Sequence, residues 1–138
     1  MKVTVFVRAT GDSEAGMMPK SEMLEAMGKY NEELVNAGIM KFGDGLRPTA
    51  HGKRVHFDGT NRTVKDGPFP VEQTIAGYWI WEVKDMAEAV AWAKKCPNPM
   101  PGPSDLEIRP HYELSDFAEA ITPEAAAVHD RVREKMKG

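Results

Sequence analysis

Residues 77–83 (GYWIWEV) are apolar on both faces when they are arranged as a strand, and this feature constrains the fold more than any other. Tyr78 and Ile80 then point to one side, and Trp79, Trp81 and Val83 point to the other. Exposed apolar patches larger than a few hundred Å² are uncommon on monomeric proteins. We therefore expect a central strand in a sheet that is covered on both sides.

Three other segments alternate between apolar and polar residues and are expected to be strands: residues 2–8, 39–46 and 105–114. In the last of them, Tyr112 and Leu114 should face inward with Leu106 and Ile108. Two basic runs, residues 53–57 and 62–65, flank Asp58-Gly59-Thr60-Asn61, which predicts a β-hairpin with a four-residue turn. Their many Lys and Arg residues are typical of a protected sheet edge.

Three segments carry helix signals. Ser21 is the expected N-cap of a helix whose apolar residues recur at helical spacing as far as Gly38. Asp85 and Glu88 resemble a capping box and predict a second helix, which ends at Pro97. A third helix should begin at Thr122-Pro123 and run to about residue 135.

The resulting order is strand, helix, strand, hairpin, strand, helix, strand and C-terminal helix. This order predicts an α+β fold of the ferredoxin-like (split βαβ) type with a β-hairpin insertion. We expect the first and third core strands to be parallel neighbours, with the first two helices on one face of the sheet. The third helix has too few large apolar residues to cover the other face. A second copy of the chain is expected to cover that face by two-fold symmetry.

Composition narrows the classes of function. The length of 138 residues suits a single domain, with a core to residue 117 and a helical tail over residues 118–138. The net charge is −3, with both signs mixed along the chain, which disfavours nucleic acid and anionic membranes as partners. One cysteine excludes an internal disulfide, and no apolar run reaches the roughly 20 residues that span a bilayer. A cytoplasmic location is expected.

The four histidines are dispersed and have no metal-ligand spacing. Gly43-Asp44-Gly45 lacks the rest of a dinucleotide-binding fingerprint. We therefore expect neither a metal site nor a cofactor.

Residues 66–69 (DGPF), followed by residues 76–83 (AGYWIWEV), resemble the YCII-related family in its DGPF-domain branch. The likeness extends through residues 13–37, 43–48 (GDGLRP) and 96–103. The resemblance implies a dimeric ferredoxin-like α/β barrel. Most such relatives have no assigned reaction. Many are encoded beside extracytoplasmic-function sigma factors, which implies a regulatory setting and a sigma-factor-related partner.

From shorter relatives, the resemblance also implies lyase-type acid/base chemistry by a histidine–aspartate pair. This chain has Asp12 and Glu14, and no histidine, in the segment where those relatives place theirs. The run after DGPF also lacks the lysine that is common in the branch.

The predicted topology sorts the polar candidate residues into two ends of the sheet. At the first end, Arg8 and the start of the helix at Ser21 form a candidate ligand site for a carboxylate or phosphate. Met17 and Met18 would form an adaptable apolar lid over it. Alternatively, Arg8 is a surface residue paired with Asp12.

At the second end we expect the DGPF turn, Glu72, Arg47 and His111. A carboxylate near a histidine can act as an acid/base pair, so Asp66 and Glu72 are the candidate catalytic residues. Arg47, Phe69 and His111 are candidate ligand contacts. Alternatively, Asp66 bonds the backbone of its own turn, and the others are solvated surface residues.

Three functions remain open. The first, which we favour, is a homodimeric domain that binds a small molecule between sheet and helix or at the subunit interface, in a regulatory setting. The second is a lyase or isomerase acting on a small anionic metabolite, with Asp66 or Glu72 as base and Arg8 as anion clamp. The third is an interaction module that contacts a sigma-factor-like partner through its tail helix.

Overall fold

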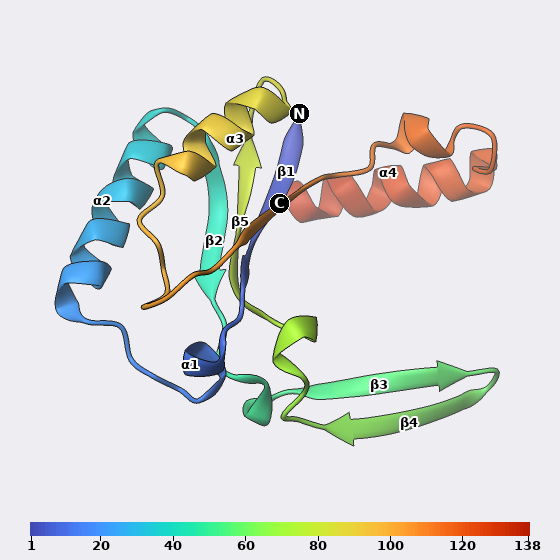
Figure 1. The fold of residues 1–138 in the computed structure, drawn as a ribbon. Helices are drawn as coiled ribbons and strands as arrows, with labels where there is room; N and C mark the ends of the chain where they lie inside the picture. The colour runs from blue at the N-terminus through green and yellow to red at the C-terminus, as the bar shows by residue number, and fades with distance from the viewer.

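A four-stranded antiparallel sheet forms the centre of the protein in the computed structural model, which describes residues 1–138. The strands lie in the order β2-β5-β1-β6 (Figure 1). They are β1 (Lys2–Arg8), β2 (Met40–Gly45), β5 (Ile75–Glu82) and β6 (Leu106–Pro110). The protein is therefore of the α+β class, as predicted.

The direction of the central strands differs from the prediction. β1 and β5 are neighbours as expected, but they are antiparallel, with Phe6 opposite Tyr78. The crossover through the first long helix brings β2 back in the direction of β1, and the return from β2 to β5 then reverses the chain. The carboxyl end of β1 therefore lies beside the amino end of β5.

Two helices, α2 (Ser21–Asn36) and α3 (Met86–Lys94), cover one face of the sheet (Figure 1). The hydroxyl of Tyr30 in α2 donates a hydrogen bond to the carbonyl oxygen of Trp92 in α3, at 2.7 Å, and so ties the helices together. Burial raises the pKa of Tyr30 above its ordinary value. Leu34 and Ala89 complete the buried helix surface.

The helix ends follow local signals. The N-cap of α2 is Lys20, which makes no side-chain cap, so the prediction of Ser21 as N-cap is wrong by one residue. Gly38 follows α2 with a φ of +74°, the left-handed conformation that glycine permits, as predicted. Asp85 caps α3 as predicted, since its carboxylate accepts from the backbone N–H of Glu88, but the Glu88 carboxylate accepts from the N–H of Lys84 rather than from that of Asp85, so the capping box is incomplete.

The core lies between this face of the sheet and the two helices. Val3, Val5 and Trp81 are fully buried there, and Trp79 is nearly so. Trp79 Nε1 donates to Asn31 Oδ1 at 2.9 Å, whereas the indole N–H of Trp81 has no hydrogen-bond partner. Both tryptophans therefore belong to the core of a single chain.

Two elements project from the other side of the sheet (Figure 1). One is the hairpin of β3 (Lys53–Asp58) and β4 (Asn61–Asp66), a separate two-stranded sheet in which every residue is exposed. Only Gly59 and Thr60 lie between these strands, so the predicted four-residue turn is too long; Gly59 adopts a φ of +58°. The other element is α4 (Pro123–Lys137), which begins as predicted.

The remaining segments are short. α1 (Gly11–Glu14) lies in the region predicted as a loop, and three 3₁₀ turns follow along the chain: η1 (Thr49–His51), η2 (Val71–Gln73) and η3 (Leu114–Phe117). β6 ends at Pro110, so the prediction that Tyr112 and Leu114 continue the strand is wrong, and Tyr112 is 78% exposed. The partner strand β1 begins at Lys2, whose carbonyl oxygen accepts from the backbone N–H of His111, so β1 has no residue left to pair with Tyr112.

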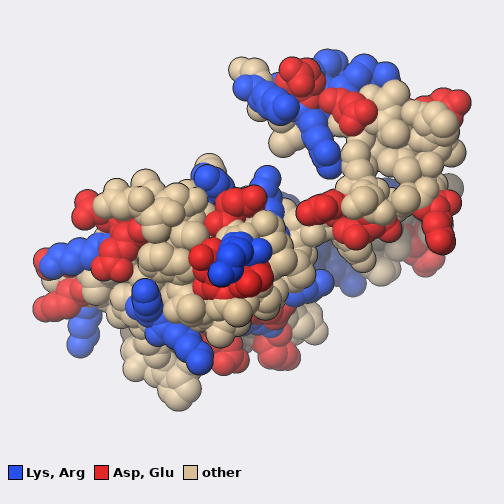
Figure 2. Space-filling model, turned by 90° about the horizontal axis from the view of Figure 1, so that it is seen from above, with Lys and Arg blue, Asp and Glu red and all other residues tan.

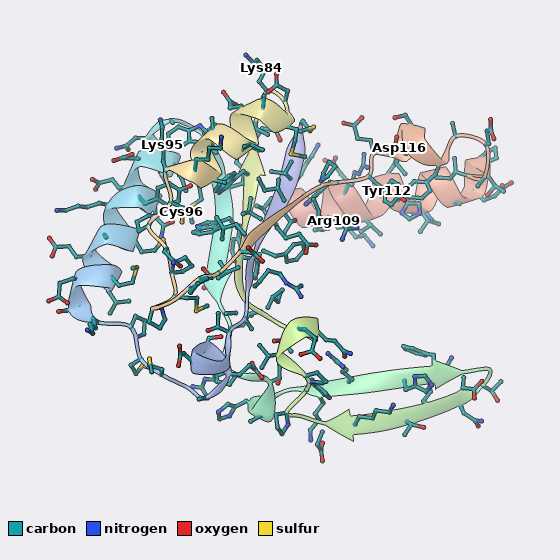
Figure 3. The ribbon with its side chains drawn as sticks, in the orientation of Figure 1. Lys84, Lys95, Cys96, Arg109, Tyr112 and Asp116 are labelled. Atoms are coloured by element: carbon teal, nitrogen blue, oxygen red, sulfur yellow. The ribbon has the colours of Figure 1, made fainter.

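The surface reflects this division into a main body and projecting parts. Figure 2, a view from above, shows a lobe that stands apart from the main body, with acidic and basic side chains interspersed over both. Arg109, Tyr112 and Asp116 follow the segment that leads from the sheet toward α4 (Figure 3). None of the helices has both the length and the apolar character needed to cross a membrane.

Candidate functional site

A large cleft of about 1170 Å³ lies between α2 and the sheet. Six of the nine methionines line it: Met17, Met18, Met23, Met27, Met40 and Met100. Methionine is unbranched and polarizable, so a surface rich in this residue adapts to ligands of different shapes. Met17 and Met18, the two residues predicted to form a lid, both lie in the lining and are exposed.

The polar groups of the cleft are few. Asn31 lies in the lining beside Trp79, from which it accepts a hydrogen bond. The charged lining residues carry both signs: Asp12, Lys20, Glu22, Asp44 and Arg47. The cleft therefore offers a mainly apolar interior and several polar groups that could orient a ligand.

Local hydrogen bonds hold the loop between β1 and α2 against the cleft. Thr10 caps α1 reciprocally with Ser13: its hydroxyl accepts from the backbone N–H of Ser13, and the hydroxyl of Ser13 accepts from that of Thr10. The Thr10 hydroxyl also donates to Met100 Sδ at 3.4 Å, which joins this loop to the proline-rich connector. The connector is fixed in turn by Asn98, which accepts from the backbone N–H of Met100.

Gly43 shapes the floor of the cleft. A Cβ at this position would lie 2.7 Å from Cδ1 of Trp79, too close for any other residue without movement of the indole. Gly43, the first glycine of the GDGLRP motif, therefore allows β2 to pack directly against the ring of Trp79.

The DGPF turn is a structural junction. A Cβ on Gly67 would lie 1.7 Å from the carbonyl oxygen of Thr49, so the turn and η1 touch backbone to backbone. The N–H of Phe69 donates to Thr49 Oγ1 at 2.9 Å, and Thr49 donates to the Glu14 carboxylate through both its N–H and its hydroxyl. The motif therefore joins the hairpin to the loops that follow β1 and β2.

The predicted division of polar residues between two ends of the sheet is wrong, because it assumed that β1 and β5 are parallel. Arg8 lies opposite Ile75, so it reaches the segment before β5, where its Nη2 donates to the carbonyl oxygen of Glu72 at 2.6 Å. Its nearest carboxylate is that of Glu107, at 3.9 Å, rather than that of Asp12. Arg47, which follows β2, is at the same end of the sheet.

The candidate acid/base residues do not meet. Asp66 lies at the base of the hairpin, is 75% exposed and pairs with Lys53 rather than with its own turn. His111 is at the opposite end of the sheet, where its backbone N–H donates to the carbonyl oxygen of Lys2 and its ring Nε2 lies 2.5 Å from Thr4 Oγ1. Neither Asp66, Glu72 nor His111 lines the cleft.

Of the predicted catalytic residues and ligand contacts, Arg47 alone lines the cleft, together with the two predicted lid residues. Ser21 does not, although its neighbours Lys20 and Glu22 do. Sequence reasoning missed Asn31 because a single asparagine within a helical pattern carries no signal of what it faces. It missed the methionine-rich lining because the six residues come from four separate segments of the chain.

Cys96 has no role in this site. It lies near the end of α3 (Figure 3), packed against the core. Burial raises the pKa of its thiol to about 11, so the group is protonated at neutral pH and is a poor nucleophile. No three His, Cys, Asp or Glu side chains are grouped so that they could hold a metal ion.

A comparison with protein families matches the YCII-related domain over residues 1–111. The chain belongs to the YCII-related family. The family resemblance seen in the sequence is therefore confirmed. The matched region includes all four strands of the central sheet together with α2 and α3, whereas α4 lies beyond it. A search of curated proteins found no match.

Proposed function

We propose that this YCII-related protein is a homodimeric domain that binds a small, largely apolar molecule in the cleft between α2 and the sheet. The observation that carries the proposal is the lining of six methionines around a cavity of about 1170 Å³. Ligand sites typically occupy roughly 300–1,000 Å³ and combine a mainly apolar lining with a few polar groups. The volume of the cleft lies slightly above this range, and its lining is of this mainly apolar kind.

Asn31 supports binding of a ligand with at least one polar atom. Its Oδ1 is engaged by the indole N–H of Trp79, which fixes the orientation of the amide. An asparagine side chain has two further N–H donors, and these are not used by another side chain here. The ligand would therefore be apolar over most of its surface and carry a hydrogen-bond acceptor.

The uncharged apolar dye Nile red tests the cleft directly. We expect the wild-type protein to increase the dye's fluorescence, and we expect the double variant Met23→Gln, Met27→Gln to bind it about tenfold more weakly. Glutamine keeps the shape of methionine but removes the apolar thioether, and burial of such a side chain contributes about 1.5–3 kcal/mol.

Met136→Gln is the matched control, because Met136 is on α4 and outside the cleft. Its dye affinity should equal that of the wild type. Equal affinities in all three proteins, or no binding by the wild type, would refute the proposed cleft.

The homodimer is supported by the other face of the sheet. Phe6, Phe42, Tyr78 and Ile80 share the face opposite α2 and α3, as their pairing across the strands requires. Phe42 and Tyr78 stack with ring centroids 6.2 Å apart, and Phe42 remains 51% exposed. No helix lies along this face in Figure 1. We propose that a second copy covers it, giving a dimeric ferredoxin-like α/β barrel.

Binding is favoured over the alternative of a lyase or isomerase. That mechanism requires a carboxylate near an acid/base partner, and Asp66, Glu72 and His111 are at separate positions outside the cleft. A regulatory setting with a sigma-factor-related partner stays a prediction of the family resemblance, as does a cytoplasmic location.

A further inference from the structure

A second cavity, of about 420 Å³, lies where the hairpin meets η1 and η2. Two arginines and a histidine line it: Arg47, Arg54 and His51. No aspartate or glutamate is among its ten lining residues, although the chain contains 21 acidic residues and carries a net charge of −3. We refer to this cavity as the cationic groove.

The charges of the cationic groove are not neutralised within the chain. None of Arg47, His51 and Arg54 takes part in an ion pair. The adjacent hairpin residue, Lys53, is different, because it pairs with Asp66. The groove therefore retains positive charge that an external anion could neutralise.

Neutral partners hold Arg54 in position. Its guanidinium lies over the ring of Phe69, 3.9 Å from the ring centroid. Its Nη1 donates to Gln73 Oε1 at 3.2 Å, and its Nη2 donates to the Gln73 carbonyl oxygen at 3.4 Å. A guanidinium has five N–H donors, so several remain for a ligand while the contacts reduce its freedom of movement.

The walls of the groove are also anchored. η1 is tied to Glu14 through Thr49, and the turn that carries Phe69 is tied to Thr49 in the same way. The hydroxyl of Thr74, a buried residue in the lining, donates to the carbonyl oxygen of Val71 and closes η2. Arg54 thus projects from the base of the hairpin and His51 from η1, and Arg47 lies just before η1.

We propose that the cationic groove is a binding site for a small anion, whose carboxylate or phosphate group is held by Arg47 and Arg54 with His51 beside it. Arginine forms paired hydrogen bonds with both of these groups. The site goes beyond the proposed function, because its lining carries two arginines and its ligand differs from that of the methionine-rich cleft. Residues 46–48 border both cavities.

Isothermal titration of the full chain with citrate and with pyrophosphate, at low salt, tests the groove. We expect the wild type to bind at least one of them, and Arg47→Gln and Arg54→Gln each to bind it about tenfold more weakly. Binding of citrate alone would identify a carboxylate ligand, and binding of pyrophosphate alone a phosphate ligand; either supports the site.

Arg62→Gln is the matched control. Arg62 belongs to the same hairpin and also lies over an aromatic ring, that of Phe57, with its guanidinium carbon 4.5 Å from the ring centroid. Its loss removes the same charge outside the groove and should leave the affinity within about twofold of wild type. An equal loss in this control, or no wild-type binding up to about 10 mM of either anion, would overturn the proposal. If Arg54→Gln unfolds the hairpin, Arg47→Gln decides, because Arg47 makes no side-chain hydrogen bond.

Discussion

The two faces of the central sheet differ in how far a single chain completes them. On the helix side, Val3, Val5 and Trp81 are fully buried beneath α2 and α3. On the other side, Phe6, Tyr78 and Ile80 are only partly buried, and Phe42 is exposed. The same strands supply both faces, because successive side chains of a strand point to opposite sides.

This difference separates two functions of apolar residues. The helix-side residues stabilise the fold of one chain, whereas those of the open side have little to contact within the chain. The hairpin and α4, which project from the open side, also expose apolar residues such as Phe57 and Val132. Mutations on the helix side should therefore change the free energy of unfolding of one chain. Mutations on the open side should change the association of two chains.

The largest effect is expected for Trp81→Ala. This substitution removes a fully buried side chain from the helix side and should lower the free energy of unfolding by about 3–5 kcal/mol. Urea denaturation measures the loss. Phe57→Ala, at a hairpin position that is 66% exposed, is the control and should cost less than about 1 kcal/mol. Similar losses for both would contradict the burial of the helix side relative to the exposed hairpin.

The second largest effect is expected for Ile80→Asp, which places a charge on the open face and tests the proposed dimer. A charge buried in a dimer interface without a partner is costly, so the dimer should dissociate at least about 100-fold more readily, while far-ultraviolet circular dichroism stays unchanged. Light scattering coupled to size exclusion measures the mass. Val35→Asp makes the same kind of change on the exposed surface of α2 and should leave the dimer intact. A wild-type monomer at micromolar concentration would refute the dimer itself.

Gly67→Ala tests how the hairpin is attached. The added methyl group would meet the carbonyl oxygen of Thr49, so the junction must shift, with an expected loss of about 1–3 kcal/mol in unfolding free energy. At Gly45, by contrast, an added Cβ meets no atom within 4 Å, so Gly45→Ala should change stability by less than about 0.5 kcal/mol. Thermal or urea unfolding distinguishes them, and equal effects would contradict the tight junction.

The smallest effect is a decline in the free energy of unfolding at alkaline pH. The groups responsible, Cys96 and Tyr30, lie on the helix side of the sheet. Burial raises the pKa of Cys96 from 9.0 to about 11, so the unfolded chain loses this proton first. Stability should be fully present below pH 9 and fall as pH rises toward 11, by roughly 1 kcal/mol after allowance for partial exposure. The raised pKa of Tyr30 acts in the same direction above its unfolded value of 10.0.

Cys96→Ala isolates the contribution of the thiol. Urea midpoints measured between pH 8 and pH 10 should fall less steeply in this variant than in the wild type. The hydroxyl of Tyr30 remains in both proteins, and its pKa is raised mainly by burial, with a smaller contribution from Cys96 that the variant removes together with the thiol. Identical pH profiles would show that the thiol is not the group responsible.

Most of the elements could be predicted because their signals are local. Gly38 ends α2, Asp85 caps α3 and Thr122 caps α4, with its side chain accepting from the N–H of Ala125. The errors arose where a neighbour far along the chain decides the outcome. Tyr112 continues the alternating pattern of β6, but it leaves the sheet because the partner strand, β1, begins at Lys2.

The candidate site was less predictable for the same reason. Arg8 and Glu72 were assigned to opposite ends of the sheet, yet the arginine contacts the carbonyl oxygen of Glu72. Arg54 was interpreted as part of a protected sheet edge, whereas in the structure it stacks on Phe69 and lines the cationic groove. Residue types were recognised correctly in both cases, but their neighbours could not be inferred from spacing.

By itself, the sequence determined where most of the strands and long helices lie and which of their residues share a face, because these depend on the period of the local backbone and on capping groups a few residues away. Only the tertiary structure decided that β1 and β5 are antiparallel, that six methionines from separate segments line one cleft, and that Arg47 and Arg54 share another cavity. Strand direction depends on how the crossovers return the chain, and each cavity is built from residues far apart in sequence. Both are set by long-range packing, which leaves no periodic signal in the order of amino acids.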